Sequence, residues 1–101
     1  MTGFVSIEKA TEALRAGKFV IIADDEGREN EGDLVVAAEF ADATAINFMA
    51  IHGRGLICCA LDHTIIERLQ LPPMVPQADN KSGFGTAFTI SVEARQGVTT
   101  G

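Results

Sequence analysis

The chain has 101 residues with 47% hydrophobic and 22% charged content, and its formal net charge is −6. This composition predicts one globular unit with a modest buried core and argues against disorder. The acidic balance and the scattered positions of the eight basic residues argue against nucleic-acid binding. We expect no membrane contact and a cytoplasmic location, because no apolar run could span a bilayer and the N-terminus lacks signal-peptide features.

The first third of the chain predicts a helix and then two strands. Ser6 is a candidate N-cap, apolar residues recur on one face of the following turns, and Gly17 is placed to end the helix. Residues 19–23 predict a short buried strand, and residues 34–38 predict a second one. The segment between them, residues 24–33 with the sequence DDEGRENEGD, is called the acidic loop below. We expect it to join neighbouring strands at one edge of a sheet.

The remainder of the chain predicts two further helices and two further strands. Asp42 can cap a helix that ends at Gly53, and residues 62–69 predict a shorter helix. Residues 56–61 are nearly all apolar, which predicts a central strand. Residues 86–93 alternate larger apolar side chains with small or polar ones, which is the period of a strand with one buried face.

This alternation of helices and strands predicts the α/β (α+β) class, with helices packed on a layered mixed sheet. Residues 94–101 begin a polar turn and supply no closing element. An alternating fold would usually continue here, so we expect a truncation after the fourth predicted strand.

The two cysteines, Cys58 and Cys59, are neighbours in the third predicted strand. On a strand they would point to opposite faces, so they cannot form an unstrained disulfide, in keeping with a reducing compartment. We expect buried apolar thiols, with one thiol beside a reaction site as the alternative.

The acidic loop holds six acidic residues and one arginine. Like charges about 5 Å apart repel by roughly 3 kcal/mol at an effective dielectric constant near 20, so this crowding calls either for full solvation or for a bound cation. Gly27 and Gly32 would give the backbone the freedom to fold the acids inward, which favours a built site over a merely solvated hairpin turn.

The donor atoms of the acidic loop indicate which metal would suit it. Carboxylate oxygens favour magnesium, manganese or calcium, and no Cys or His set has zinc spacing. Magnesium prefers few protein ligands together with water and an anionic substrate. One or two of Glu29, Glu31 and Asp33 would be enough, and Arg28 would remain available to hold a phosphate or an oxyanion.

Segments along the whole chain together resemble one known family. The chain contains, in this order, DDEGRENEGDL, INFMAIHGRGLICCAL, LQLPPM, FGTAFTISVEA and GVTTG. These segments resemble the 3,4-dihydroxy-2-butanone 4-phosphate synthases of riboflavin biosynthesis. Because the resemblance covers essentially all of the chain, it implies that residues 1–101 are the N-terminal part of a single domain of that family.

The resemblance implies a lyase that converts ribulose 5-phosphate to 3,4-dihydroxy-2-butanone 4-phosphate and formate. Members of this family need a divalent cation, Mg²⁺ or Mn²⁺, and work as homodimers with active sites near the subunit interface. Removing a proton next to a ketone needs a positioned carboxylate base and a Lewis acid, and several carboxylates around one cation can supply both.

The resemblance also implies roles for individual residues. Arg28 and Glu29 would contact the sugar phosphate, with Glu29 also the metal ligand. Asp33 would bind substrate hydroxyls, and Glu31 would act as an acid, a base or an orienting group. The catalytic set would then be Glu29, Glu31 and Asp33, and the residues lining the pocket would include Cys58 and Thr99.

Members of this family continue past the GVTTG turn with a histidine that completes the metal site and a glutamate needed for catalysis. The 101 residues alone are therefore expected to be inactive or severely impaired. Some members are fused to GTP cyclohydrolase II, and the chain leaves open whether its parent was. The alternative function is a non-catalytic module for divalent-cation binding or dimerisation, in which the loop serves stability.

Overall fold

The computed structural model describes residues 3–80 and 87–99. They contain three α-helices and one two-stranded antiparallel sheet, which confirms the mixed α/β class. The chain divides into two compact units, Met1–Cys59 and Ala60–Gly101. That both units belong to one domain stays a prediction.

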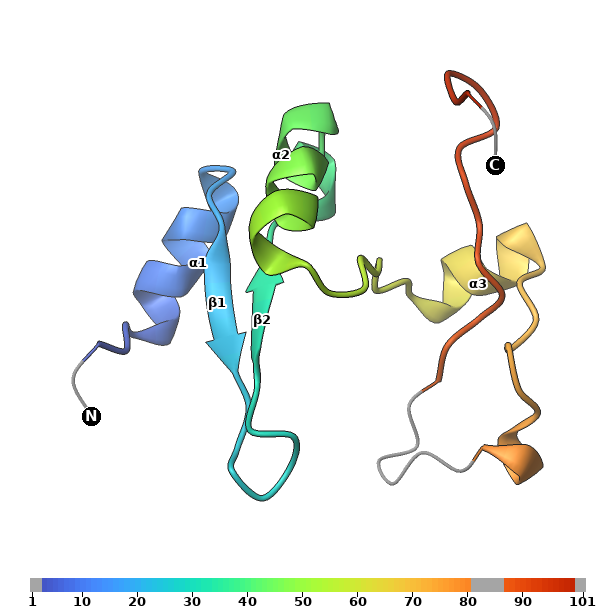
Figure 1. Cartoon of the computed structure of the whole chain (residues 1–101), viewed down its shortest axis with the longest axis horizontal. Helices are drawn as coiled ribbons and strands as arrows, with labels where there is room; N and C mark the ends of the chain where they lie inside the picture. Colours follow the sequence, from blue (N-terminus) through green and yellow to red (C-terminus); the bar gives the residue numbers. More distant parts are fainter. Residues whose placement is uncertain (1–2, 81–86, 100–101) are drawn as a thin grey trace. The chain divides into compact units, whose positions relative to one another are not determined.

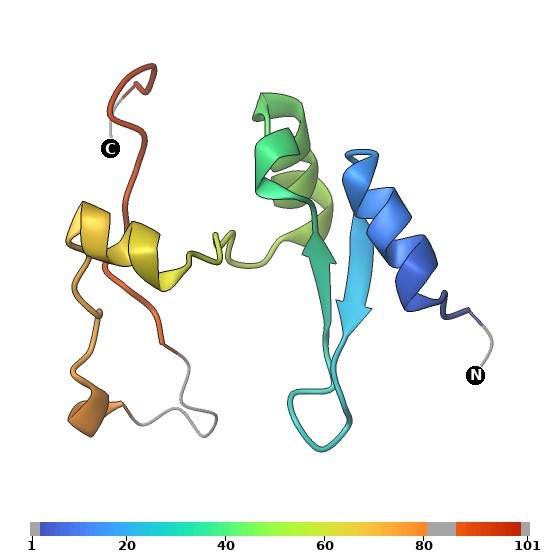
Figure 2. The same cartoon turned by 180° about the vertical axis from the view of Figure 1, so that it is seen from behind.

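The first unit is built around a β-ribbon, formed by strands β1 and β2. Helix α1 lies beside β1, and α2 lies beyond the end of β2 (Figures 1 and 2). In chain order its elements are α1 (Ile7–Arg15), β1 (Val20–Ala23), β2 (Gly32–Val35), the 3-10 turn η1 (Ala38–Phe40), α2 (Ala43–Phe48) and the π-helical turn η2 (Met49–Gly53).

Helix α1 begins and ends where the local sequence signals predict. The Ser6 hydroxyl accepts a hydrogen bond from the backbone N–H of Lys9 at 3.2 Å, as an N-cap does. Gly17, directly after the helix, has φ +76°, a left-handed conformation that glycine adopts without a Cβ clash. Both predictions for this helix are confirmed.

The acidic loop is the connection of a β-hairpin. Strands β1 and β2 pair antiparallel, with Val20 opposite Val35 and Ala23 opposite Gly32. This confirms that the loop joins neighbouring strands. The second strand begins two residues earlier than predicted, because backbone pairing extends the ladder to Gly32 and Asp33, which the apolar pattern does not mark.

Helix α2 also follows its predicted signals. The Asp42 carboxylate accepts a hydrogen bond from the N–H of Ala45 at 2.8 Å, and the helix continues through η2 to Gly53. The turn closes with a hydrogen bond from the N–H of Arg54 to the carbonyl of Met49 at 3.2 Å. Arg54 has φ 59° and is the left-handed residue that ends the helix.

The second unit contains α3 (His63–Leu69) and the 3-10 turn η3 (Gln77–Asp79). Asp62 caps α3 by accepting the N–H of Ile65 at 2.9 Å, which confirms this helix. The predicted strand over residues 86–93 is wrong for the described part, 87–93, which has one isolated bridge between Thr89 and Pro73; residue 86 lies outside the described residues. A proline in the partner segment cannot donate to a ladder, and this limits the pairing.

The prediction of a central strand over residues 56–61 is also wrong. These residues form no strand in the structure, and both cysteines are exposed, so the expected burial of the thiols is wrong as well. Apolar side chains favour a strand, but a strand forms only when another backbone lies beside it. Residues 56–61 belong to no sheet among the described residues, so the expected layered mixed sheet reduces to the β1–β2 ribbon.

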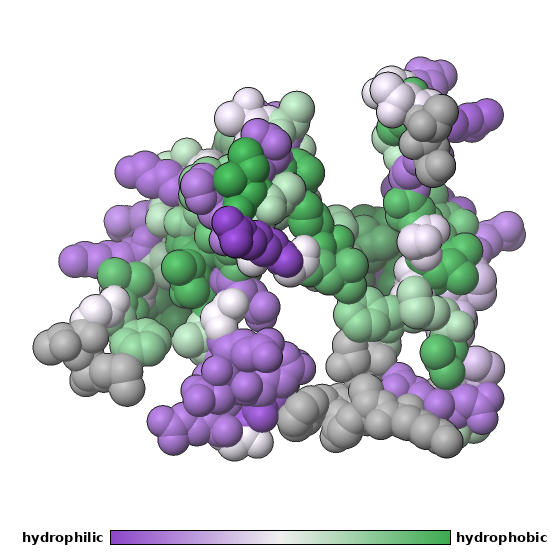
Figure 3. Space-filling model, in the orientation of Figure 1, coloured by the Kyte–Doolittle hydropathy of each residue, from purple (hydrophilic) through white to green (hydrophobic). Residues whose placement is uncertain are grey.

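The predicted hydrophobic core is missing from the part of the chain that the structure describes. None of these residues is fully buried, and hydrophobic surface is visible among the hydrophilic patches of the face in Figure 3. The side chains of Ile21 and Leu56, for example, are 74% and 79% exposed. A ribbon of two strands has too few neighbours to enclose such side chains, since independent sheets usually need three or more strands or a covering helix. No helix among the described residues has the length and apolar character needed to cross a bilayer.

Candidate functional site

The acidic loop is organised by the carboxylate of Asp24. Its Oδ1 accepts the backbone N–H of Glu31 at 2.7 Å. Its Oδ2 accepts the backbone N–H of Glu29 at 2.9 Å and Nη1 of Arg28 at 3.0 Å. One side chain therefore holds three residues to which the resemblance assigns a role in catalysis, substrate binding or metal binding.

Backbone hydrogen bonds tighten the same loop. The N–H of Asp24 donates to the carbonyl of Glu31 at 3.1 Å, and the N–H groups of Arg28 and Asn30 both donate to the carbonyl of Asp25. Asn30 takes the left-handed conformation, with φ 53°. Asn tolerates this region better than most residues, so Asn30 is the left-handed residue of this turn, and Gly27 and Gly32 both have negative or extended φ.

These contacts lower the pKa of the Asp24 carboxyl below its usual value of 3.8. The largest cause is the N–H of Glu31 and the next is the N–H of Glu29, with Arg28 adding to them against the opposing effect of desolvation. Hydrogen bonds and cations stabilise the charged form of an acid, so Asp24 stays ionised in the folded loop.

Acidification is expected to loosen the acidic loop only below the usual titration range of aspartate. Because the pKa of Asp24 is depressed in the folded state, its stabilisation is complete above the unfolded value and is lost as the pH falls through the folded value. Amide NMR shifts of Glu29 and Glu31, followed from about pH 5 to about pH 2, measure this change. A common midpoint at or above 3.8 would contradict it.

Arg28 lies between two carboxylates instead of standing apart from the acids. Its Nη1 is 3.0 Å from Asp24 Oδ2, and its Nη2 is 3.5 Å from Glu29 Oε1. The Arg28 side chain is 51% exposed and that of Glu29 is 38% exposed, so both charged groups can be reached from solvent. The Arg28 guanidinium is therefore accessible to an anion from solvent, and its planar fork matches the oxygens of a phosphate.

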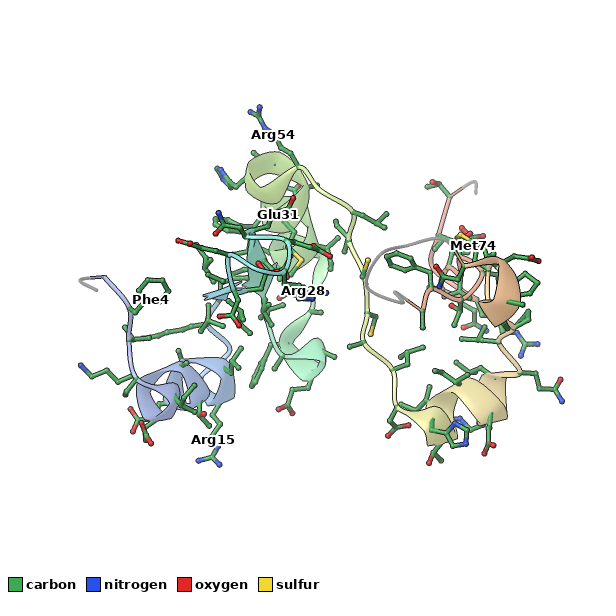
Figure 4. All side chains as sticks on the ribbon, turned by 90° about the horizontal axis from the view of Figure 1, so that it is seen from below. Phe4, Arg15, Arg28, Glu31, Arg54 and Met74 are labelled. Atoms are coloured by element: carbon green, nitrogen blue, oxygen red, sulfur yellow. The ribbon has the colours of Figure 1, made fainter. Side chains whose placement is uncertain are left out.

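Glu31 and Asp33 are exposed, and the hairpin places Glu31 near Arg28 (Figure 4). Within the described ranges no three acidic, imidazole or thiol groups converge into a ready-made metal site. The donors still suit a hard cation in type, because Mg²⁺ uses one or two protein carboxylates with water and substrate oxygens. The acids therefore offer a partial site, with Glu29 and Glu31 as the residues that could hold the metal.

A shallow hollow of about 370 Å³ lies at the opposite end of the β-ribbon from the acidic loop. Its lining includes Gly17, Phe19, Phe40 and Phe48, and none of the acidic loop. The rings of Phe19 and Phe48 stack with their centroids 5.0 Å apart. This hollow is an apolar contact region of the first unit and is not the predicted substrate pocket.

Two of the predicted pocket residues, Cys58 and Thr99, lie outside the acidic loop. Cys58 is exposed at the end of the first unit, where its Sγ is 3.8 Å from the carbonyl oxygen of Leu56. Thr99 is exposed in the second unit. Their place in a substrate pocket stays a prediction.

The role of Asp24 was missed at the level of sequence, where it counted as one acid among six. A signal existed, since Asp24 is the first residue after a strand and Asp side chains readily accept backbone N–H groups in turns. The spacing of four residues to Arg28 was a second signal.

Comparison with known proteins gives one consistent result. The family model described as 3,4-dihydroxy-2-butanone 4-phosphate synthase matches residues 8–101. The chain is 54% identical over 96 residues to the 3,4-dihydroxy-2-butanone 4-phosphate synthase of Pseudomonas aeruginosa, covering 95% of the chain and 26% of that relative. It is 50% identical over 99 residues to the bifunctional riboflavin biosynthesis protein RIBA 1, chloroplastic, of Arabidopsis thaliana, covering 98% of the chain and 18% of that protein.

Solved structures are similar as well. A crystal structure of 3,4-dihydroxy-2-butanone 4-phosphate synthase in complex with two magnesium ions matches with a TM-score of 0.87 and 41% identity, over 96% of this chain and 44% of that one. RibBX of A. baumannii, a two-domain 3,4-dihydroxy-2-butanone 4-phosphate synthase, matches with a TM-score of 0.80 and 48% identity. The match covers 96% of this chain and 28% of that one. The chain thus spans about a quarter of the Pseudomonas relative's length and less than half of either solved chain.

Proposed function

Because the chain belongs to the 3,4-dihydroxy-2-butanone 4-phosphate synthase family, we propose that it serves the conversion of ribulose 5-phosphate to 3,4-dihydroxy-2-butanone 4-phosphate and formate. We assign to these 101 residues the binding of the sugar phosphate and of the metal. The observation that carries this proposal is the ordered acidic loop, in which Arg28 and Glu29 form an accessible pair held by Asp24.

Each candidate site residue has a proposed task. Arg28 binds the phosphate through its guanidinium, whose fork geometry matches phosphate oxygens. Asp33 accepts hydrogen bonds from substrate hydroxyls. Glu31 moves or orients a proton at the carbon next to the ketone, as a carboxylate base does. Cys58 and Thr99 complete the pocket wall.

Glu29 is the proposed ligand of Mg²⁺, with Mn²⁺ as a substitute of the same ligand preference. When bound, such a cation stabilises negative charge that develops on substrate oxygens. The exposed Glu29 carboxylate, 3.5 Å from Arg28, supports this assignment because metal and phosphate would then meet side by side. The magnesium ions named for the solved relative support it too.

We further propose that the protein works as a homodimer in the cytoplasm. The exposed apolar side chains of the β-ribbon support an assembled state, since exposed apolar surface of this extent is unusual for a monomer.

The test separates the lyase role from a non-catalytic cation-binding or dimerisation module. In calorimetry with Mg²⁺ and ribulose 5-phosphate added in either order, the lyase role predicts that each ligand tightens binding of the other by the same factor, about tenfold or more. The non-catalytic module predicts that the affinity for Mg²⁺ is the same with and without ribulose 5-phosphate. We expect the 101 residues to bind both ligands without measurable formate release, and turnover near that of a full-length relative would contradict this.

A further inference from the structure

Asp24 differs from every other residue of the acidic loop. It is the only one of residues 24–33 that is not exposed, and its side chain is 18% exposed while those of Arg28 and Glu29 are 51% and 38% exposed. An acidic side chain turned away from solvent among exposed acids makes its contacts within the protein. Asp24 therefore has another task than Glu29 or Asp33.

We propose that Asp24 is a positioning residue, which holds the metal-binding and phosphate-binding residues of the acidic loop and itself contacts neither ligand. This inference rests on the proposed function, which assigns ligand contacts to Arg28, Glu29 and Glu31. Asp24 contacts all three, by two backbone N–H groups and one guanidinium nitrogen.

The geometry shows why Asp24 is suited to this task. Both carboxylate oxygens are engaged, at 2.7 Å and 2.9 Å from backbone nitrogens, so the Glu29 and Glu31 backbones are held on one carboxylate. The backbone N–H of Asp24 donates a hydrogen bond to the carbonyl of Glu31, so Asp24 and Glu31 are joined by two hydrogen bonds, one in each direction. A ligand then meets a loop that is already ordered and loses less conformational freedom on binding.

Charge alone could explain an effect of Asp24, so a matched acid is needed as a control. Asp25 is the next residue, has the same charge and is exposed. Its carbonyl accepts two backbone hydrogen bonds, which a side-chain substitution leaves in place. Asp25→Ala therefore removes one charge from the same loop without removing the acceptor of the Glu29 and Glu31 amides.

The experiment compares Asp24→Ala, Asp24→Asn and Asp25→Ala in the 101-residue chain. Mn²⁺ is the probe, and its affinity is measured by electron paramagnetic resonance with and without ribulose 5-phosphate. Removal of a group that supports a metal ligand typically lowers the affinity for the metal about 10-fold to 100-fold. Asp24→Ala is therefore expected to weaken Mn²⁺ binding about tenfold or more. Asp24→Asn keeps one acceptor oxygen but places an NH2 donor against the donors that the second oxygen accepted, so it should recover only part of that loss. Asp25→Ala should change the affinity by less than about threefold.

Amide NMR gives the second readout and keeps the two proposals distinguishable. Asp24→Ala should move the amide signals of Glu29 and Glu31 and leave those of Ile21 and Leu34 in the β-ribbon in place. If the unsubstituted chain fails to bind Mn²⁺, the proposed function fails, and the amide signals still decide the role of Asp24. Equal losses of Mn²⁺ affinity in the Asp24→Ala and Asp25→Ala variants would overturn the positioning role of Asp24. Unchanged amide signals of Glu29 and Glu31 in Asp24→Ala would overturn it as well. Should Asp24→Ala lose the ribbon signals, Asp24→Asn is used instead: it should keep the ribbon signals and move the amide signal of Glu29 or Glu31, and unchanged signals of both would contradict the positioning role.

Discussion

Replacing Glu29 by alanine is expected to abolish the coupling between the binding of Mg²⁺ and that of ribulose 5-phosphate. It should also weaken Mg²⁺ binding on its own by at least about tenfold. Mg²⁺ takes few protein ligands, so the loss of its proposed carboxylate leaves mainly water to hold it. The substitution also removes the contact of Glu29 with Arg28 Nη2 at 3.5 Å. Calorimetry with both ligands measures the effect.

The control for this prediction is Glu26→Ala. Glu26 lies in the same loop, carries the same charge and is exposed, and it has no proposed ligand contact. Exposed charges contribute little individually, so this variant should keep the coupling and lose less than about threefold in Mg²⁺ affinity. Equal behaviour of the two variants would show that Mg²⁺ responds to the total charge of the loop, and Glu29 would then lose its assignment as a ligand.

Replacing Gly17 by valine is expected to destabilise the first unit by about 2–3 kcal/mol. Gly17 has φ +76°, which a β-branched residue adopts only with strain, and a Cβ there would lie 3.1 Å from Cδ1 of Phe40. The exposed ring of Phe40 can shift, but its place in the hollow beside Phe48 changes when it does. In a unit without a fully buried side chain, a loss of this size is a large share of the stability.

Urea unfolding followed by circular dichroism measures this loss, with Gly53→Ala as the matched control. Gly53 is helical and not left-handed, and a Cβ there would meet Leu34 Cδ2 at an ordinary 3.9 Å. Alanine is favoured over glycine in helices by up to about 1 kcal/mol, so the control should be neutral or slightly stabilising. A Gly17→Val variant as stable as the control would refute the strain assigned to this turn.

The helices were predictable because their signals act over three or four residues. Ser6, Asp42 and Asp62 each accept the N–H three residues further along, so the side chain and its partner lie in the same short segment. The hairpin connection was predictable for a similar reason, since two short apolar strands flank a polar segment. Such signals need no knowledge of the rest of the fold.

The strands over residues 56–61 and 86–93 were not predictable in the same way. Their apolar pattern states which side chains favour burial, and it contains no information about which backbone lies opposite. Around Pro73 the pairing is limited to one bridge, and residues 56–61 form no strand in the described chain. The exposure of Cys58 follows from this, because a thiol is buried by neighbours and not by its own segment.

The sequence by itself determined the family, the residue types of the acidic loop and the ends of the helices. Only the tertiary structure showed that Asp24 turns inward to hold Glu29 and Glu31, and that Asn30 supplies the left-handed turn. The physical reason is the range of the interactions. Caps and hairpin patterns depend on neighbours along the chain, whereas the task of one acid among six depends on which donors the folded backbone brings within hydrogen-bonding distance.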